Sequence, residues 1–130
     1  MAGRSSAPRQ GAELVGRVGE LAGRFGIKVK TEFRCGRRLW GSVRHIDVVL
    51  SHGDLRLGVE CKYQATAGSA EEKLIATIKD IEAWPIPGIL VFDGEGFSEK
   101  MTAYLFSTGK AVQFEDLENW LKLFFALDET

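Results

Sequence analysis

The sequence predicts an α/β domain in which a mixed sheet packs between helices. Residues 11–25 place apolar side chains three and four positions apart, which is typical of an amphipathic helix. Residues 27–34 alternate apolar and polar side chains, and residues 43–50 are rich in β-branched residues, so both segments are expected to be strands. Beyond residue 69 helices alternate with short strands, and the order α-β-β-β-α-β-α-β-α favours a sheet covered on its faces.

The chain length bounds the number of domains. With 130 residues, the chain is long enough for one hydrophobic core. We expect the polar residues 1–10 to be a flexible tail and residues 11–130 to form a single domain. No apolar run approaches the roughly 18 residues that a membrane span needs, and no secretory signal is recognised. Two cysteines make no disulfide framework, so a cytoplasmic protein with free thiols is expected.

Charge is distributed unevenly along the chain, although the net charge is only −1. Residues 1–45 carry ten Lys and Arg against three acidic residues, whereas residues 46–130 carry seven basic and fifteen acidic residues. A basic half and an acidic half in one small domain indicate a surface that faces a polyanion. The alternative is that these charges simply mix on the folded surface.

The expected first helix carries two stripes of residues. One is apolar and would face the core: Leu14, Val18, Leu21 and Phe25. The other is small and would let another backbone, including a nucleic-acid strand, approach closely: Ala12, Gly16, Gly19 and Gly23. Gly26 is expected to end this helix.

Turn signals divide the rest of the chain. Residues 51–54 (Ser-His-Gly-Asp) predict a turn, so the strands over 43–50 and 55–63 are expected to pair as a hairpin, whereas residues 35–42 predict a loop. The later elements are a helix capped by Ser69 that stops before Pro85, a strand over 88–92, a helix over 98–107, a strand over 111–114 and a helix over 116–126.

Three charged residues interrupt the apolar strands of the expected hairpin. Asp47 lies in its first strand, and Glu60 and Lys62 lie in its second. A period of two puts Glu60 and Lys62 on one face and turns Cys61 to the other, where core packing is expected. Charges inside a sheet are normally paired or bound to metal, because burying them alone is costly.

A bound Mg²⁺ would explain these charges. Mg²⁺ takes oxygen ligands from one or two carboxylates, lowers the pKa of a bound water and neutralises charge on phosphate. Lys62, two residues after Glu60, can orient that water or hold the phosphate. The alternative is a solvated hairpin face on which Asp47 and Lys62 form a cross-strand ion pair.

These residues and the order of elements resemble the PD-(D/E)XK nuclease superfamily, which has the restriction-endonuclease-like fold. The resemblance covers roughly Gly11 to Phe92 and implies an α-β-β-β-α-β core, with an extra α-β-α segment at the C-terminus. Glu60-Cys61-Lys62 matches the (D/E)-x-K element fully. Ile46-Asp47 stands where the family often has Pro-Asp, so the proline is missing.

The resemblance also implies a set of site residues. Asp47, Glu60 and the backbone carbonyl of Cys61 would bind Mg²⁺ or Mn²⁺, and Gln64 would join the catalytic residues. The family often adds a Glu from the first helix, for which Glu13 is preferred and Glu20 is the alternative. Both could instead form surface pairs with the arginines four residues on.

Nucleic-acid contacts are expected from basic residues around this motif: Arg34, Arg37, Arg38, Arg44 and Lys73. Trp40 could stack on a base or anchor the core, and His45 could contact DNA or be structural.

The resemblance implies a metal-dependent nuclease that cuts DNA, similar to small phage or bacterial nucleases and Holliday junction resolvases. The alternatives are a catalytically inactive nucleic-acid-binding domain of the same fold and a small interaction module. Expected partners are DNA, a second copy of the chain and a protein that supplies specificity, but no membrane. The apolar C-terminal helix could be a dimer surface, although ordinary core packing is the simpler interpretation.

Overall fold

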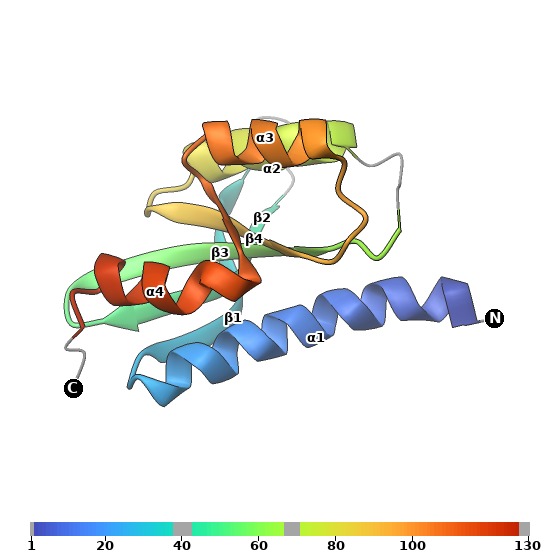
Figure 1. Ribbon diagram of the computed structural model, residues 1–130. Coiled ribbons are helices and arrows are strands. Elements are labelled where there is room, and N and C mark those ends of the chain that lie inside the picture. The colour runs from blue at the N-terminus through green and yellow to red at the C-terminus, as the bar shows by residue number, and fades with distance from the viewer. Residues whose placement is uncertain (1, 38–42, 67–70, 128–130) are drawn as a thin grey trace.

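A computed structural model describes residues 2–37, 43–66 and 71–127, which form a sheet with helices on both faces (Figure 1). The elements, in chain order, are α1 (Ala2–Arg24), β1 (Lys28–Arg37), β2 (Val43–His52), β3 (Leu55–Tyr63), α2 (Glu71–Glu82), β4 (Gly88–Asp93), α3 (Glu99–Ser107), β5 (Ala111–Gln113) and α4 (Phe114–Phe124). This is the order that the periodicities predict, so the α/β class with a mixed sheet is confirmed.

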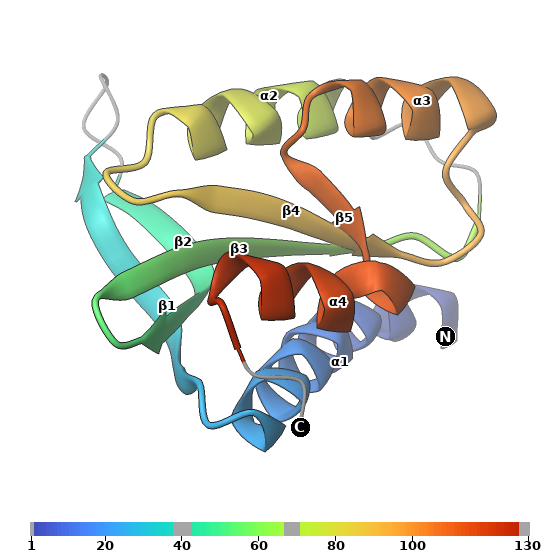
Figure 2. The same cartoon turned by 60° about the vertical axis from the view of Figure 1, so that its left-hand side comes forward.

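The strands lie in the sheet in chain order, β1-β2-β3-β4-β5. β1, β2 and β3 pair antiparallel, and the expected hairpin closes with His52 opposite Leu55. β3, β4 and β5 pair parallel, and α2 and α3 provide the crossovers that parallel strands require. Figure 2 shows that β1 and β2 run steeply across the direction of β3 and β4, so the sheet is strongly twisted on this side.

Each face of the sheet has its own hydrophobic cluster. α1 and α4 cover one face, and α2 and α3 cover the other (Figures 1 and 2). The first cluster joins α1 and α4 to the sheet through residues that include Leu14, Val18, Leu117, Leu121, Val48 and Val59. The second joins α2 and α3 to the sheet through residues that include Leu74, Ile78, Met101, Leu105, Leu90 and Phe92. Membership of one cluster or the other therefore shows to which face of the sheet a buried strand residue points.

Trp84 closes the second cluster over two glycines. Its ring lies so close to Gly58 of β3 that a Cβ there would come within 2.7 Å of Cζ3, and a Cβ at Gly88 of β4 would overlap the ring as well. The two glycines let Trp84 reach the sheet backbone and become 92% buried.

Two boundaries differ clearly from those expected, the start of α1 and the end of β1. α1 begins at Ala2 rather than residue 11, so residues assigned to a flexible tail belong to a helix; they include Ala, Arg and Gln, which favour helices. β1 continues to Arg37 into the expected loop, since its pairing with β2 extends that far. Ser98 caps α3 as expected by accepting a hydrogen bond from Met101 N at 3.0 Å, whereas Ser69 lies outside the described residues.

The apolar C-terminal helix is mainly core. Leu117, Leu121 and Phe125 are buried against the sheet, whereas Leu123 remains 83% exposed. Its use as a dimer surface stays a prediction. Among the described helices, none is both long and apolar enough to cross a membrane.

Candidate active site

The backbone ladder between β2 and β3 stops before the charged residues. Its last pair is Val48 with Val59, so Asp47 and Glu60 come directly after the paired region. Here each carboxylate takes the place of a backbone acceptor. Asp47 N donates to Glu60 Oε1 at 3.1 Å, and Cys61 N donates to Asp47 Oδ2 at 3.0 Å. The two strands are therefore joined by side chains at this point, and the two carboxyl groups are held close together.

An interruption in strand alternation opens this end of the sheet. Ile46 and Val48 are two residues apart and would ordinarily share a face, yet Ile46 packs in the α2/α3 cluster and Val48 in the α1/α4 cluster. Their partners on β1 are Phe33 and Thr31, and the residue between these, Glu32, has a φ of +53°. The alternation of β1 and β2 therefore changes at the same point, Glu32 opposite Asp47. The backbone pairing of β2 with β3 ends at this point as well.

Asp47 faces a cavity of about 250 Å³ between the sheet and α1. Ala12 and Val15 of α1 and Thr31 and Glu32 of β1 line this cavity with it. Burial raises the pKa of the Asp47 carboxyl, the hydrogen bond from Cys61 N lowers it, and the negative charge of Glu32 raises it further. A cation in this position would relieve both the burial cost and the repulsion.

Glu60 and Lys62 share one face of β3, as expected. Glu60 is in register with Leu90 and Lys62 with Phe92, and both β4 residues pack in the α2/α3 cluster. The side chains of Glu60 and Lys62 are half-buried. Within the described part of the chain Asp47 forms no ion pair with Lys62, so its hydrogen bond to Cys61 N replaces the expected cross-strand alternative.

Cys61 points to the opposite face. With Tyr63 it packs against the α1/α4 cluster, as the alternation predicts. Burial raises the pKa of its thiol strongly, and the charges of Asp47 and Glu60 raise it further. The thiol is therefore protonated near neutral pH, and its side chain serves packing rather than nucleophilic chemistry.

Neither of the two glutamates expected from α1 is among the residues that line the cavity at Asp47. Ala12 and Val15 define the flank of α1 that faces this carboxylate. Glu13 is rotated from that flank and lies one turn before Arg17, whose Nη1 contacts Asp93 Oδ2 at 2.9 Å beside β4. Glu13 and Glu20 are both exposed, and among the described residues no three His, Cys, Asp or Glu side chains form a group that could hold a metal. Their place in the site stays a prediction that this geometry does not support.

Glu32 is the acidic neighbour of Asp47 that sequence reasoning missed. It lines the same cavity and its charge acts on the Asp47 carboxyl. The available signal was a single acidic residue inside an otherwise basic strand, Lys28-Val-Lys-Thr-Glu-Phe-Arg34. Its position opposite Asp47 depends on the turn in β1 and β2, which the alternation of apolar residues does not reveal.

Gln64 has a structural partner. Its side-chain amide Nε2 donates to Gly96 O at 2.8 Å, and Gly96 N donates to Gln64 O at 2.7 Å. These bonds tie the end of β3 to the segment that follows β4. A catalytic role for Gln64 would require that its side chain leave this contact.

The expected nucleic-acid contacts are only partly described. Arg34 and Lys73 are exposed, on β1 and α2 respectively, and His45 is exposed opposite Arg34 on β2. Arg38 and Trp40 lie outside the described residues, as do the side chains of Arg37 and Arg44. Arg34 therefore stands on the same strand as Glu32, within reach of the region around Asp47.

The donor set fits a small divalent cation. Asp47 and Glu60 supply carboxylate oxygens from adjacent strands, and the Cys61 main chain lies beside Asp47 Oδ2. Mg²⁺ and Mn²⁺ prefer such oxygen ligands and complete their coordination with water and phosphate. Burial first, and the charge of Glu32 to a smaller extent, raise the pKa of Asp47, and a cation beside the carboxylate would offset both effects.

A family model described as a PD-(D/E)XK nuclease superfamily domain matches residues 7–124. The chain belongs to this superfamily. The match begins within α1 and continues to the end of α4, so the segment after β4 is included along with the α-β-β-β-α-β core. The superfamily resemblance drawn from Asp47 and Glu60-Cys61-Lys62 is thereby confirmed.

A solved structure supports the fold. The crystal structure of a protein of unknown function, AF1548, is similar with a TM-score of 0.56 at 21% sequence identity. The similarity covers 78% of this chain and 56% of that one, so the chain spans little more than half the length of its structural neighbour. No curated protein matches the sequence.

Proposed function

We propose that this PD-(D/E)XK domain is a divalent-metal-dependent nuclease that hydrolyses phosphodiester bonds of DNA. The observation that carries the proposal is a pair of hydrogen bonds across the open end of β2 and β3, from Asp47 N to Glu60 Oε1 and from Cys61 N to Asp47 Oδ2. It fixes two carboxylates at one point of the sheet, and Lys62 follows on the face of Glu60. Superfamily membership supports nuclease chemistry in general.

Each residue has a distinct part in this proposal. Asp47 and Glu60 hold Mg²⁺ or Mn²⁺, with the Cys61 carbonyl as a further oxygen ligand, and the bound cation supplies an acidified water and charge neutralisation. Lys62 holds a phosphate oxygen or orients the water, since a fixed ammonium stabilises the charge that develops on the phosphate. The backbone N–H groups of Asp47 and Cys61 donate to the two carboxylates and so orient them.

The test is cleavage of labelled nucleic acids by the full chain. The panel contains duplex, nicked, flap and four-way-junction DNA, single-stranded DNA and RNA, each with Mg²⁺, Mn²⁺ or EDTA. Asp47→Asn and Lys62→Met are compared with Asp54→Asn in the exposed hairpin turn and Lys79→Met on the exposed face of α2. Metal-dependent cutting that only the first two variants lose supports the proposal and identifies the substrate.

A second candidate is a domain that binds nucleic acid without cutting it. The observation that favours it is the flank of α1 facing Asp47, which carries Ala12 and Val15 rather than a carboxylate. Folded protein that binds members of the panel but cuts none of them, with either metal, would establish this function instead.

A further inference from the structure

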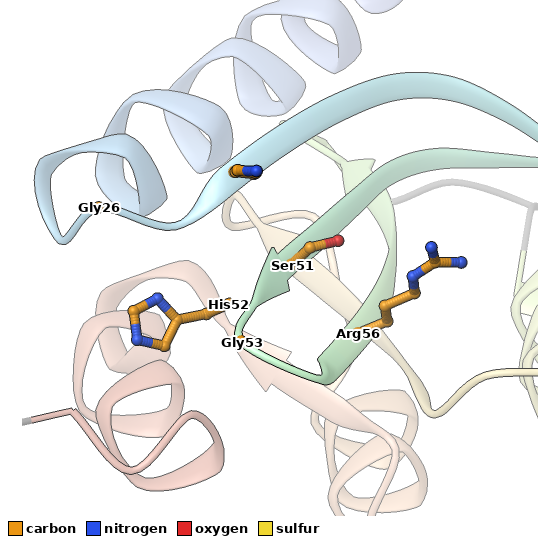
Figure 3. A pocket seen from close by; sticks show the side chains of 6 residues that line it. Gly26, Ser51, His52, Gly53 and Arg56 are labelled. Atoms are coloured by element: carbon orange, nitrogen blue, oxygen red, sulfur yellow. The ribbon is translucent and has the colours of Figure 1, made fainter.

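A row of polar and basic side chains crosses the sheet at the hairpin end, away from Asp47. Register places Lys28 of β1 opposite Ser51 of β2, and Ser51 opposite Arg56 of β3. Adjacent strands are about 4.8 Å apart, so the two cations flank the hydroxyl at short range. Figure 3 shows the Ser51 and Arg56 side chains directed to the same side, whereas His52 is directed away from them.

This row borders a cavity of about 440 Å³. The cavity is lined by Gly26, Lys28, Ser51, His52, Gly53 and Arg56 (Figure 3). The ring of His52 lies on the α4 side, where its centroid is 6.2 Å from that of Phe125. The charge of the cavity therefore comes from Lys28 and Arg56, and its neutral donors are the Ser51 hydroxyl and glycine backbone.

A second hollow of about 380 Å³ lies on the side of the sheet to which Val49 points. It is lined by Phe33, Arg34, Val49, Arg56, Pro85 and Ile86. Arg56 is common to both hollows. Lys30 also belongs to this face, since its Nζ lies 5.1 Å from the centroid of the Phe33 ring. We call Lys28, Lys30, Arg34 and Arg56 the basic face.

Carboxylates are absent from the described lining of the two hollows. Among the residues described, no acidic side chain forms an ion pair with any of the four cations of the basic face. Four cations from two strands of one sheet face, with an aromatic ring between them, form a surface suited to a phosphate backbone.

The basic face lies some distance along the sheet from Asp47, and this separation decides which phosphates it could contact. Ser51 is four residues from Asp47 on β2, which is about 13 Å at the strand rise, and Lys28 to Arg34 spans about 20 Å of β1. Trp84, seated on Gly58, separates the basic face from Glu60 on β3. Arg56 and Glu60 are four residues apart on β3 and so point to the same side of the sheet, and a nucleic acid on the basic face would present phosphates that flank the one at Glu60 and Lys62.

We infer that the basic face is a second, non-catalytic contact with the phosphate backbone, which anchors the nucleic acid beside the cutting site. The inference rests on the proposed function for the identity of the ligand. It assigns Lys28, Lys30 and Arg56 to substrate binding and extends the contact from Arg34 to the hairpin turn. Phosphate contacts of this kind carry affinity and register rather than sequence recognition.

The experiment measures binding without metal, so that no cutting is needed. Fluorescence anisotropy follows a labelled 20-nucleotide duplex and the corresponding single strand, from 50 to 300 mM KCl with EDTA. The variant Lys28→Gln/Arg56→Gln is compared with Lys79→Gln/Lys100→Gln, which removes two exposed lysines from α2 and α3. Circular dichroism and thermal unfolding confirm that both variants are folded.

The expected result is a selective loss in the basic-face variant. Removing two phosphate contacts should lower the slope of log K against log salt by about 1.8 on duplex and weaken binding at least roughly tenfold at 100 mM salt. The control pair should bind as the parent protein does. Equal losses in both variants, no loss in either, or no binding by the parent would overturn the inference.

The nuclease proposal has a separate outcome. A parent that cuts while its basic-face variant binds normally would refute the second contact and leave the nuclease intact. A parent that binds through Lys28 and Arg56 but never cuts would retain the contact and refute the nuclease.

Discussion

The two ends of the β2–β3 pair use opposite means to hold the same strands together. At the hairpin end the strands are joined by a regular backbone ladder from His52/Leu55 to Val48/Val59, and the exposed side chains there include Arg56. Beyond Val48 the ladder ends, and the carboxylates of Asp47 and Glu60 accept the backbone hydrogen bonds. Two carboxylates can therefore be brought together inside a sheet where they, rather than backbone carbonyls, accept the hydrogen bonds between two strands.

The difference also separates two electrostatic environments. At the hairpin end, cations are exposed and no acid lines the cavity among the described residues, whereas at the open end burial and Glu32 raise the pKa of Asp47. The cations of the hairpin end could contact a phosphate backbone directly. The carboxylates of the open end could do so only with a bound cation between them and the phosphate. The predictions below change one end while using the other as control.

The largest effect is expected from the loss of a carboxylate charge at the open end. Glu60→Gln retains an oxygen that can accept from Asp47 N but removes the negative charge that a cation needs. We expect cutting to fall on the order of 10²–10³-fold. Asp54→Asn makes the same chemical change in the hairpin turn and should leave the rate unchanged. A single-turnover assay measures both, and a similar loss in the two variants would contradict the distinction.

Trp84 separates the two ends, and its packing can be tested through stability. A Cβ at Gly88 would overlap the Trp84 ring, so Gly88→Ala should lower the free energy of unfolding by about 1–3 kcal/mol. Gly16→Ala is the matched control, because a Cβ there meets nothing within 4 Å, and it should be neutral or stabilising. Urea unfolding gives both values. An equal cost in the two variants would show that Trp84 is not seated on the sheet.

The hairpin turn should be separable from the chemistry. Gly53 has a φ of +60°, and an alanine in this conformation is expected to lower stability by about 1 kcal/mol. Cutting at saturating enzyme should not change, because the turn lies at the far end of β2 from Asp47. Thermal unfolding and the same cleavage assay measure the two effects. Loss of cutting in folded Gly53→Ala would indicate that the two ends are coupled.

The smallest effect concerns pH and Asp47 without metal. The pKa of Asp47 in the folded chain is raised above its ordinary value of 3.8. The folded state is therefore destabilised relative to the unfolded state as the pH rises from 3.8 through the raised pKa, because Asp47 ionises less readily when folded. Asp47→Asn should therefore raise the melting temperature by a few degrees at pH 7.5 in EDTA, and this gain should disappear as pH falls toward the ordinary value. Asp54→Asn should show no such trend. A stabilisation that is constant with pH would contradict the raised pKa.

Patterns in the sequence predicted most of the elements. β-branched runs and the Ser-His-Gly-Asp turn located β2 and β3, and Ser98 located the start of α3. The start of α1 was missed because a polar composition does not distinguish a tail from an exposed helix. The positions of Asp47, Glu60 and Lys62 on adjacent strands followed from period-two alternation and the hairpin.

The rest of the site depends on geometry that local patterns do not contain. The stripe from Leu14 to Leu21 indicates which face of α1 is buried, but the flank facing Asp47 depends on how the helix is placed over the sheet. The preference for Glu13 rests on the resemblance alone, whereas the α1 residues that line the cavity at Asp47 are Ala12 and Val15. Glu32 was missed because the interruption in alternation is a property of two paired strands.

Cation binding at the open end is the feature on which the proposed chemistry depends. Isothermal titration of Mn²⁺ into the wild-type chain, Asp47→Asn, Glu60→Gln and Asp54→Asn at pH 7.5 measures it without any nucleic acid. We expect saturable binding by the wild type and Asp54→Asn, with affinity at least about tenfold weaker in the other two variants. Equal Mn²⁺ affinity in all four proteins, or none in the wild type, would contradict a metal site between β2 and β3.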